Sequence, residues 1–231
     1  MIKLPKYSDQ VMYDAETIFH LYMKQERLAK FIVHYELFKL ANKIPGTIVE
    51  CGVFKGTSLM RFAMFRNLLG TNASSKILGF DVFSDSYPTT EFEEDNEQRD
   101  FWINTAGESS ISVDQMTKVM KDRDIDNFDL IPGDVLETIP AYISENPGLK
   151  VSLLNIDIDF VEPTLCALEH FYDLVVPGGI IIFDNYAGEG DSGKFLHGDT
   201  KGIDDFFKNV SVEIKRFPFA ARPCYMIKKW N

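Results

Sequence analysis

Acidic residues recur at the ends of short apolar segments along this chain. The five positions that show this pattern are Glu50, Asp81, Asp134, Asp157 and Asp184. If the apolar segments are parallel strands, these acids gather at the carboxyl edge of the sheet, where open α/β sheets bind their ligands. Carboxylates at such an edge can accept hydrogen bonds from hydroxyls, balance a cationic ligand or hold a metal ion. This concentration of acids is the main functional signal in the sequence.

The segments around Asp157 and Asp184 carry the most specific of these signals. Asn185 follows Asp184 directly, so two carboxylates and an amide oxygen would converge at neighbouring strand ends. Such hard oxygen ligands suit Mg²⁺, which also keeps waters or substrate oxygens. If these groups were only loop caps and helix N-caps, they would repel one another without compensation. We therefore predict a metal site at Asp157, Asp184 and Asn185, with Asp159 pointing into the supporting structure.

The turn after the first apolar segment contains two glycines, Gly52 and Gly56, which let the backbone bend sharply and approach a ligand closely. The middle glycine of the dinucleotide-binding pattern is absent, and the Glu50 carboxylate suits a cationic ligand better than a pyrophosphate. The candidate cofactor-binding residues of this turn are Glu50, Gly52, Gly56, Thr57 and Ser58. The alternative is that the glycines only shape a turn between a strand and a helix.

Asp81 ends the second apolar segment, where a carboxylate can accept hydrogen bonds from both hydroxyls of a ribose. A cap for the following loop is the alternative role, but the glycine turn nearby favours ribose binding. Gly133 and Asp134 follow the third segment and, with Asp157, complete the predicted cofactor site.

Short apolar segments that alternate with amphipathic stretches must position these residues. The predicted strands cover residues 47–51, 77–82, 128–131, 151–156 and 180–183, and the predicted helices cover 58–69, 112–123, 163–174, 202–208 and a segment that begins at 134–137. This alternation predicts a parallel sheet with helices on both faces. Residues 212–217 and 224–229 are two further strands, and the six residues between them are too few for a crossover helix, so they should form an antiparallel hairpin. The expected fold is an α/β, Rossmann-like, seven-stranded sheet that is mostly parallel and closes with this hairpin.

Residues 1–45 are predicted to be an N-terminal helical extension, because apolar residues recur there at helical spacing before Pro45-Gly46. Residues 46–231 form the main domain. The helices of the extension either cover a ligand pocket or pair two subunits of a homo-oligomer, and both alternatives stay open.

The composition is that of an ordinary globular protein: of the 231 residues, 45% are hydrophobic and 26% are charged. The formal net charge of −11 would repel the phosphates of nucleic acids. Apolar residues never run uninterrupted for about 18 positions, so we expect no membrane span. The isolated cysteines Cys51, Cys166 and Cys224 indicate reduced thiols. We expect a cytoplasmic protein that has neither nucleic acid nor a membrane as its partner.

From about Ile44 to Lys208 the sequence resembles the macrocin O-methyltransferase family (the TylF, MycF and NovP type). The closing hairpin is likewise typical of methyltransferases of the large Rossmann-like class. The matching motifs are Glu50-x-Gly52-x-x-x-Gly56, Phe80-Asp81-Val82-Phe83 with Pro88, Pro132-Gly133-Asp134 leading to Thr138-Ile139-Pro140, Asp157-x-Asp159 with Thr164, and Pro177-Gly178-Gly179 with Asp184-Asn185-Tyr186. Their combination is far more specific than any one motif.

The resemblance implies that S-adenosyl-L-methionine is the cofactor and that a hydroxyl of a small molecule, with a sugar as the leading acceptor, is methylated. One departure concerns the metal: the family usually has two aspartates before the tyrosine, whereas Asn185 takes the second place here. The Asp-Asn pair instead resembles the metal-dependent catechol-type methyltransferases, so metal binding is expected with one less negative charge. A hydroxyl bound to Mg²⁺ would lose its proton more easily.

Asp157 and His197 are the candidate catalytic residues. His197 lies in the glycine-rich loop 187–198, beyond the predicted metal edge, and is our candidate for the general base. A solvated histidine without a catalytic role is the alternative. Residues 84–108 form a long acidic insertion with aromatic residues, which predicts either a lid over the cofactor or acceptor, or a solvated face with a few core anchors.

Two other functions compete with O-methylation. A nucleotide-cofactor oxidoreductase is disfavoured by the missing glycine and by the closing hairpin. A catalytically silent subunit that binds the cofactor and serves a partner is the second alternative. Binding of S-adenosylmethionine rather than NAD would exclude the oxidoreductase. Measured turnover would exclude the silent subunit.

Overall fold

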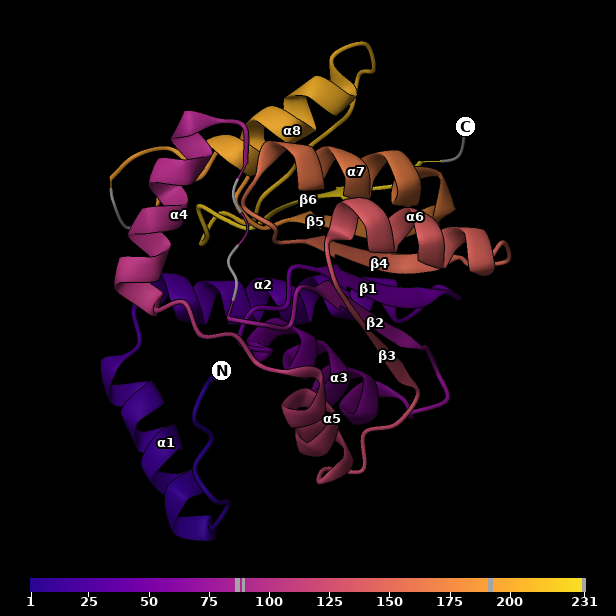
Figure 1. Ribbon diagram of the computed structural model, residues 1–231. Helices are drawn as coiled ribbons and strands as arrows, with labels where there is room; N and C mark the ends of the chain where they lie inside the picture. The colour runs from indigo at the N-terminus through magenta and orange to yellow at the C-terminus, as the bar shows by residue number, and fades with distance from the viewer. Residues whose placement is uncertain (86–87, 89, 191–192, 230–231) are drawn as a thin grey trace.

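A mixed sheet between two layers of helices forms the centre of the computed structural model, which describes residues 1–85, 88, 90–190 and 193–229 (Figure 1). Its strands are β1 (Thr47–Cys51), β2 (Ile77–Asp81), β3 (Phe128–Pro132), β4 (Val151–Ile156), β5 (Val175–Phe183) and β6 (Cys224–Ile227). They lie in the order β3-β2-β1-β4-β5-β6, with β6 antiparallel to β5 and the other pairs parallel. The predicted α/β fold with a mostly parallel sheet is confirmed.

Helices cover both faces of this sheet, as predicted. The helices α2 (Gln25–Ala41), α3 (Thr57–Leu69) and α5 (Val113–Lys121) lie on one face, and α6 (Val135–Glu145), α7 (Val161–Phe171) and α8 (His197–Phe207) lie on the other (Figure 1). Successive strand residues point to opposite faces. Ile48 therefore packs into the first core and Val49 into the second, and both are buried. This two-sided burial explains why the strands read as continuous apolar segments.

Two helix starts confirm the capping signals in the sequence. Ser112 and Gln115 form a reciprocal capping box at α5, and the Asp134 carboxylate accepts a hydrogen bond from the Leu136 amide (2.9 Å) at α6. Helix α7 begins at Val161, so Pro163 occupies its third position instead of the predicted first. A 3₁₀ turn at Tyr172–Leu174 links α7 to β5. None of the helices in the described part of the chain is long and apolar enough to cross a membrane.

The prediction of a seventh strand at residues 212–217 is wrong, and the described residues form six strands. Lys215 and Tyr225 make an isolated antiparallel bridge, in which each backbone N–H donates to the other carbonyl at 2.8 Å. The next pair toward the turn would need an amide hydrogen from Pro223, which proline lacks, so the ladder cannot extend in that direction. The predicted antiparallel closure is instead made by β6 against β5, from Cys224 opposite Phe183 to Ile227 opposite Ile180.

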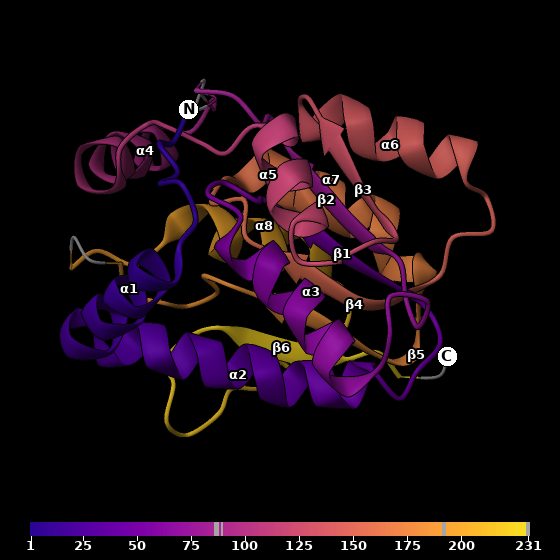
Figure 2. The same cartoon turned by 90° about the horizontal axis from the view of Figure 1, so that it is seen from below.

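The predicted N-terminal extension contains two helices with different environments. Helix α1 (Asp9–Tyr22) has no buried residue and lies away from the sheet in both views (Figures 1 and 2). Helix α2 packs against α3 and the sheet through Val33, Leu37 and Phe38, which are almost fully buried. Helix α2 is thus built into the core of the main domain. The boundary at residue 45 and the two roles expected of the extension stay predictions.

At the carboxyl edge of the sheet, the backbone after β1 packs closely against the backbone after β4. Gly52 has a φ of 91°, and a Cβ atom added there would lie 1.8 Å from the backbone oxygen of Asp157. The Asp157 amide in turn donates to the Cys51 carbonyl at 2.9 Å. A glycine at position 52 thus allows the first turn to approach the residue that was predicted to be catalytic.

We expect Gly52→Ala to destabilise the protein far more than Gly107→Ala. Gly107 also has a positive φ (78°), but a Cβ there would meet nothing within 4 Å. Gly107→Ala should cost about 1–3 kcal/mol of unfolding free energy from the backbone conformation alone, because φ 78° and ψ 156° lie in a region that essentially only glycine adopts. Gly52→Ala adds a clash with backbone and should cost more than about 3 kcal/mol. Urea unfolding of both variants measures the difference, and equal costs would contradict the close approach.

Candidate functional site

A cavity of about 960 Å³ lies at the carboxyl edge of the sheet. The predicted site residues that line it are Gly52, Thr57, Ser58, Asp81, Asp134, Asp157, Asp184 and Asn185. Glu50, Gly56, Gly133 and His197 were also predicted for the site, but they are not among the lining residues. This volume lies near the upper end of ordinary small-molecule sites, which leaves room for a cofactor and a second small molecule.

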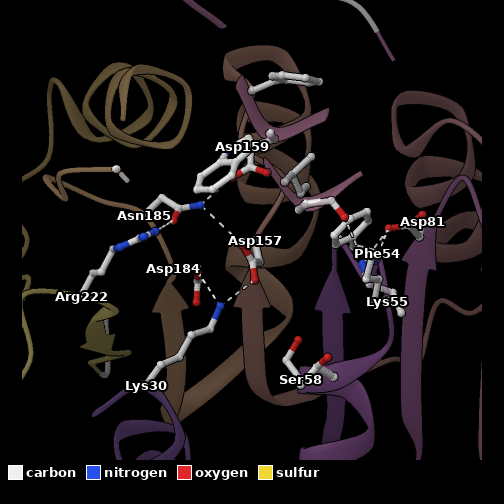
Figure 3. Close-up of a pocket in the computed structure, with 18 of the residues that line it drawn as sticks. Lys30, Phe54, Lys55, Ser58, Asp81, Asp157, Asp159, Asp184, Asn185 and Arg222 are labelled. Atoms are coloured by element: carbon white, nitrogen blue, oxygen red, sulfur yellow. Dashed lines mark hydrogen bonds and ion pairs between the residues drawn. The ribbon is translucent and has the colours of Figure 1, made fainter. Parts of the chain in front are cut away.

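Asp81 fixes the conformation of the glycine turn. One of its carboxylate oxygens accepts hydrogen bonds from the amides of Val53 (2.7 Å) and Phe54 (2.8 Å), and the other accepts from the Phe83 amide (2.9 Å) (Figure 3). The alternative role of a loop cap is therefore present in the structure. Asp81 also lines the cavity, so ribose binding by its carboxylate stays a prediction.

Unusual backbone conformations gather at the same edge. Phe54, Phe83, Asp159 and Ala187 have φ values of 48°, 50°, 73° and 51°, in the left-handed region that residues with a side chain rarely adopt. They follow β1, β2, β4 and β5 respectively. Such conformations persist only where the surroundings hold them, and they cluster at functional sites. The sequence contains no signal for them, since none of the four is a glycine.

Glu50 lies beneath the cavity and not on its surface. Its side chain is completely buried, and it accepts a hydrogen bond from the Asn155 amide at 2.8 Å. Burial raises the pKa of Glu50 to about 8. The predicted contact of this carboxylate with a cationic ligand stays a prediction.

A lysine from α2 lies between the two aspartates of the predicted metal site. The Lys30 Nζ atom is 2.7 Å from Asp184 Oδ2 and 3.1 Å from Asp157 Oδ2 (Figure 3). The Asn185 amide group donates to Asp159 Oδ1 at 2.7 Å, and its oxygen accepts a hydrogen bond from Arg222. The structure thus brings the predicted residues together and adds two basic side chains to them.

Burial and charge act in opposite directions in this cluster. Burial favours a raised pKa at Asp184, but the charge of Lys30 and the contact with His34 hold this pKa below its ordinary value. Burial and the neighbouring charge of Asp184 raise the pKa of Asp157. Burial lowers the pKa of His34 to about 4, so its imidazole is neutral at pH 7. Burial also opposes the charge of Lys30, yet the two carboxylates raise its pKa overall.

The predicted ligands do not fit Mg²⁺ in this arrangement. Two of the three, Asp157 and Asp184, converge on a cation, but that cation is the Lys30 ammonium. The third, Asn185, directs its oxygen to Arg222. No group of three or more His, Cys, Asp or Glu side chains in the described part of the chain could hold a metal ion. One observation favours a further ligand: the Asp184 Oδ1 atom is buried and has no hydrogen-bond partner.

Lys30 and Arg222 are the site residues that sequence reasoning missed. Lys30 precedes the region in which family motifs were found, and Arg222 lies between the two strands expected in the closing hairpin. Both residues line the cavity. A lysine on an amphipathic helix is usually solvated, so residue type and spacing alone carried no sign of either contact.

The insertion at residues 84–108 contains helix α4 (Glu93–Ala106), and residues 86, 87 and 89 of it lie outside the described part. The buried Asp95 of α4 accepts one hydrogen bond from the Val161 amide (3.0 Å) and pairs with His197 Nδ1 (2.7 Å). Trp102 of α4 lines the cavity. His197 thus connects α4 to α8 instead of facing the cavity, and its role as a base stays a prediction.

Comparisons with known proteins agree with this geometry. The family model of macrocin O-methyltransferase (TylF) matches residues 10–209, which include nearly all of α1, the whole of α2 and the region where the motifs were found. The chain belongs to the macrocin O-methyltransferase (TylF) family. It is therefore an S-adenosylmethionine-dependent O-methyltransferase, as the motifs predicted. A search of curated protein sequences found no match.

Solved structures with a similar fold include one methyltransferase and two O-methyltransferases. The calicheamicin methyltransferase CalS11 is 22% identical, with a TM-score of 0.72 over 95% of this chain and 86% of that chain. The O-methyltransferase NovP is 16% identical, with a TM-score of 0.70 over 87% and 80% of the two chains. An O-methyltransferase from Bacillus cereus in complex with SAH is 16% identical, with a TM-score of 0.53 over 85% and 81%. At these identities the likeness confirms the fold.

The raised pKa of Glu50 predicts a pH-dependent stability. Between its ordinary pKa of 4.5 and about 8, the folded protein holds a proton that the unfolded chain has lost. The free energy of unfolding should therefore fall as pH rises through this range. The side chain in Glu50→Gln cannot ionise. The free energy of unfolding of this variant, relative to that of the wild type, should therefore increase from about pH 5 to pH 8 and then level off. Urea unfolding at a series of pH values tests this, with the exposed Glu145→Gln as a control that shows no such trend.

The Asp95–His197 pair is expected to anchor helix α4. Asp95→Asn should weaken the pair and loosen α4, at a cost of about 1–3 kcal/mol, because a buried hydrogen-bonded carboxylate is lost. Hydrogen exchange followed by mass spectrometry should then show faster exchange across residues 93–106. Asp100→Asn is the matched control, since Asp100 is exposed on the same helix. Unchanged protection in Asp95→Asn would contradict the anchoring role.

Proposed function

We propose that this protein transfers a methyl group from S-adenosylmethionine to a hydroxyl of a small sugar-bearing acceptor, either a nucleotide-linked sugar or a glycoside. The observation that carries the proposal is the shared cavity, which joins the glycine turn and Asp81 on one side to Asp157, Asp184 and Lys30 on the other. The name of one structural neighbour and the name of the family support the acceptor class. One structure of CalS11 is described as a TDP-rhamnose 3'-O-methyltransferase, and the family is named for the methylation of macrocin.

Asp157 has the position expected for the residue that accepts the hydroxyl proton. It follows β4 between the turn after β1 and the Asp184-Asn185 end of β5, and its side chain is about one-fifth exposed to the cavity. S-adenosylmethionine supplies a methyl group that is displaced in line from its sulfonium. The turn at Gly52 and the carboxylate of Asp81 would hold the cofactor, and Trp102 would help to exclude water.

Magnesium, which the sequence predicted here, is the alternative to the Lys30 ammonium as the positive charge, although the observed arrangement of its predicted ligands does not fit it. The buried, unpartnered Asp184 Oδ1 favours it. Asp157, Asp184 and Asn185 would be its ligands once Lys30 and Arg222 had moved away. The ion would supply acidification of a bound hydroxyl. A cytoplasmic location and assembly into a homo-oligomer stay predictions.

Calorimetry and turnover test the proposed function. The protein should bind S-adenosylmethionine and S-adenosylhomocysteine but not NAD, since the turn lacks the dinucleotide pattern. Radiolabelled cofactor should then label one or more members of a panel of nucleotide-linked sugars and glycosides. Binding of NAD without the sulfonium cofactor would support the oxidoreductase instead. Cofactor binding without turnover on any member of the panel would support the silent subunit.

Asp157→Asn tests the proton acceptor. Loss of the carboxylate should lower kcat by about 100-fold or more, which is the usual contribution of a general base. The Kd for S-adenosylmethionine should change much less, because the glycine turn and Asp81 remain. Asp122→Asn, at an exposed surface pair with Lys118, is the matched control and should behave as the wild type. Full kcat in Asp157→Asn would exclude the proposed role.

A further inference from the structure

Lys30 reaches the cavity from an element that is distant in sequence. It is separated from Asp157 by 127 positions and from Asp184 by 154, yet its ammonium pairs with both carboxylates (Figure 3). Helix α2 is fixed beside the sheet by Val33, Leu37 and Phe38, which follow Lys30 on the same helix and are buried. The core therefore determines where the stem of Lys30 begins, and the two ion pairs determine where its ammonium lies.

The neighbouring basic groups leave Lys30 as the cation that balances the two aspartates. His34, one turn further along α2, is buried, and its Nε2 atom lies 3.8 Å from Asp184 Oδ1, too far for a hydrogen bond. Arg61 contacts the other ring nitrogen of His34 at 3.1 Å, and Arg222 contacts Asn185. Neither arginine makes an ion pair with Asp157 or Asp184 among the described contacts.

We propose that Lys30 is the built-in cation of this active site and that it replaces the divalent metal ion expected from the sequence. This inference rests on the proposed O-methyltransferase function. An ammonium has three donors, and two of them are used by Asp157 and Asp184. Since Lys30 lines the cavity, the third can donate to the oxygen of an acceptor hydroxyl and stabilise the negative charge that develops as its proton leaves.

Distances explain why Lys30 and a metal ion exclude each other. Mg²⁺ binds carboxylate oxygens at about 2.0–2.1 Å. The ammonium of Lys30 already lies 2.7 Å and 3.1 Å from the same two oxygens. A divalent ion bound to both would be placed almost on the ammonium, and like charges at such a separation repel strongly. Removal of the ammonium should therefore convert the aspartate pair into a metal site.

Metal binding tests this inference without any acceptor. Titration with Mn²⁺, followed by calorimetry and electron paramagnetic resonance, should show no tight site in the wild-type protein. Lys30→Ala should gain one Mn²⁺ site, with affinity raised at least about 10-fold over the wild type, because two carboxylates lose their counter-charge. Lys30→Met keeps most of the apolar stem and should gain the same site, which covers the case in which Lys30→Ala does not fold. Lys39→Ala removes a lysine of α2 that pairs with the half-buried Glu36, and it should gain no site.

Activity provides the second measurement. Wild-type turnover should persist in the presence of a chelator, whereas Lys30→Met should lose about 100-fold in kcat and recover part of it when Mg²⁺ is added. Lys30→Arg keeps the charge and should retain more activity than Lys30→Met without metal. Tight Mn²⁺ binding by the wild type, or loss of its turnover on chelation, would overturn the inference. If no acceptor is methylated, the proposed function fails, but the Mn²⁺ titration still decides the role of Lys30.

Discussion

A buried and a partly buried carboxylate at neighbouring strand ends require a positive charge, and this requirement connects most of the structure. Asp184 is only 3% exposed, and Asp157 lies beside it. An uncompensated pair of this kind would cost several kcal/mol or would bind a proton. Lys30 supplies the charge, so the aspartates depend on the correct docking of α2. Helix α2 therefore lines the cavity as well as forming part of the core.

The opposite side of the cavity is organised by hydrogen bonds to one carboxylate. Asp81 accepts from three backbone amides and thereby holds Phe54 and Phe83 at positive φ. The close approach of Gly52 to Asp157 joins this preorganised turn to the charged cluster. A cofactor in the turn would then have a fixed position relative to the aspartates, which is the main contribution a protein can make to a displacement reaction.

Sequence patterns predicted the elements well wherever the decisive contacts are local. The predicted ranges for β1 and β4 agree with the structure, because strands buried on both faces are largely apolar. The capping signals at Ser112 and Asp134 were correct because a cap involves residues only two or three positions apart. The hairpin prediction failed for a different reason. Residues 212–217 have the composition of a strand, but Pro223, opposite the last of them, cannot continue the ladder toward the turn.

The sequence by itself determined the fold class, the acidic edge of the sheet and the family, since each depends on residue type and on spacing along the chain. The tertiary structure alone decided which charges meet at that edge. It placed Lys30 between Asp157 and Asp184, directed Asn185 to Arg222 and paired His197 with Asp95. These contacts join residues that are far apart in the chain, and they depend on how α2 and α4 pack against the sheet. Periodicity can predict that such helices exist, but the position of one ammonium group follows only from their docking.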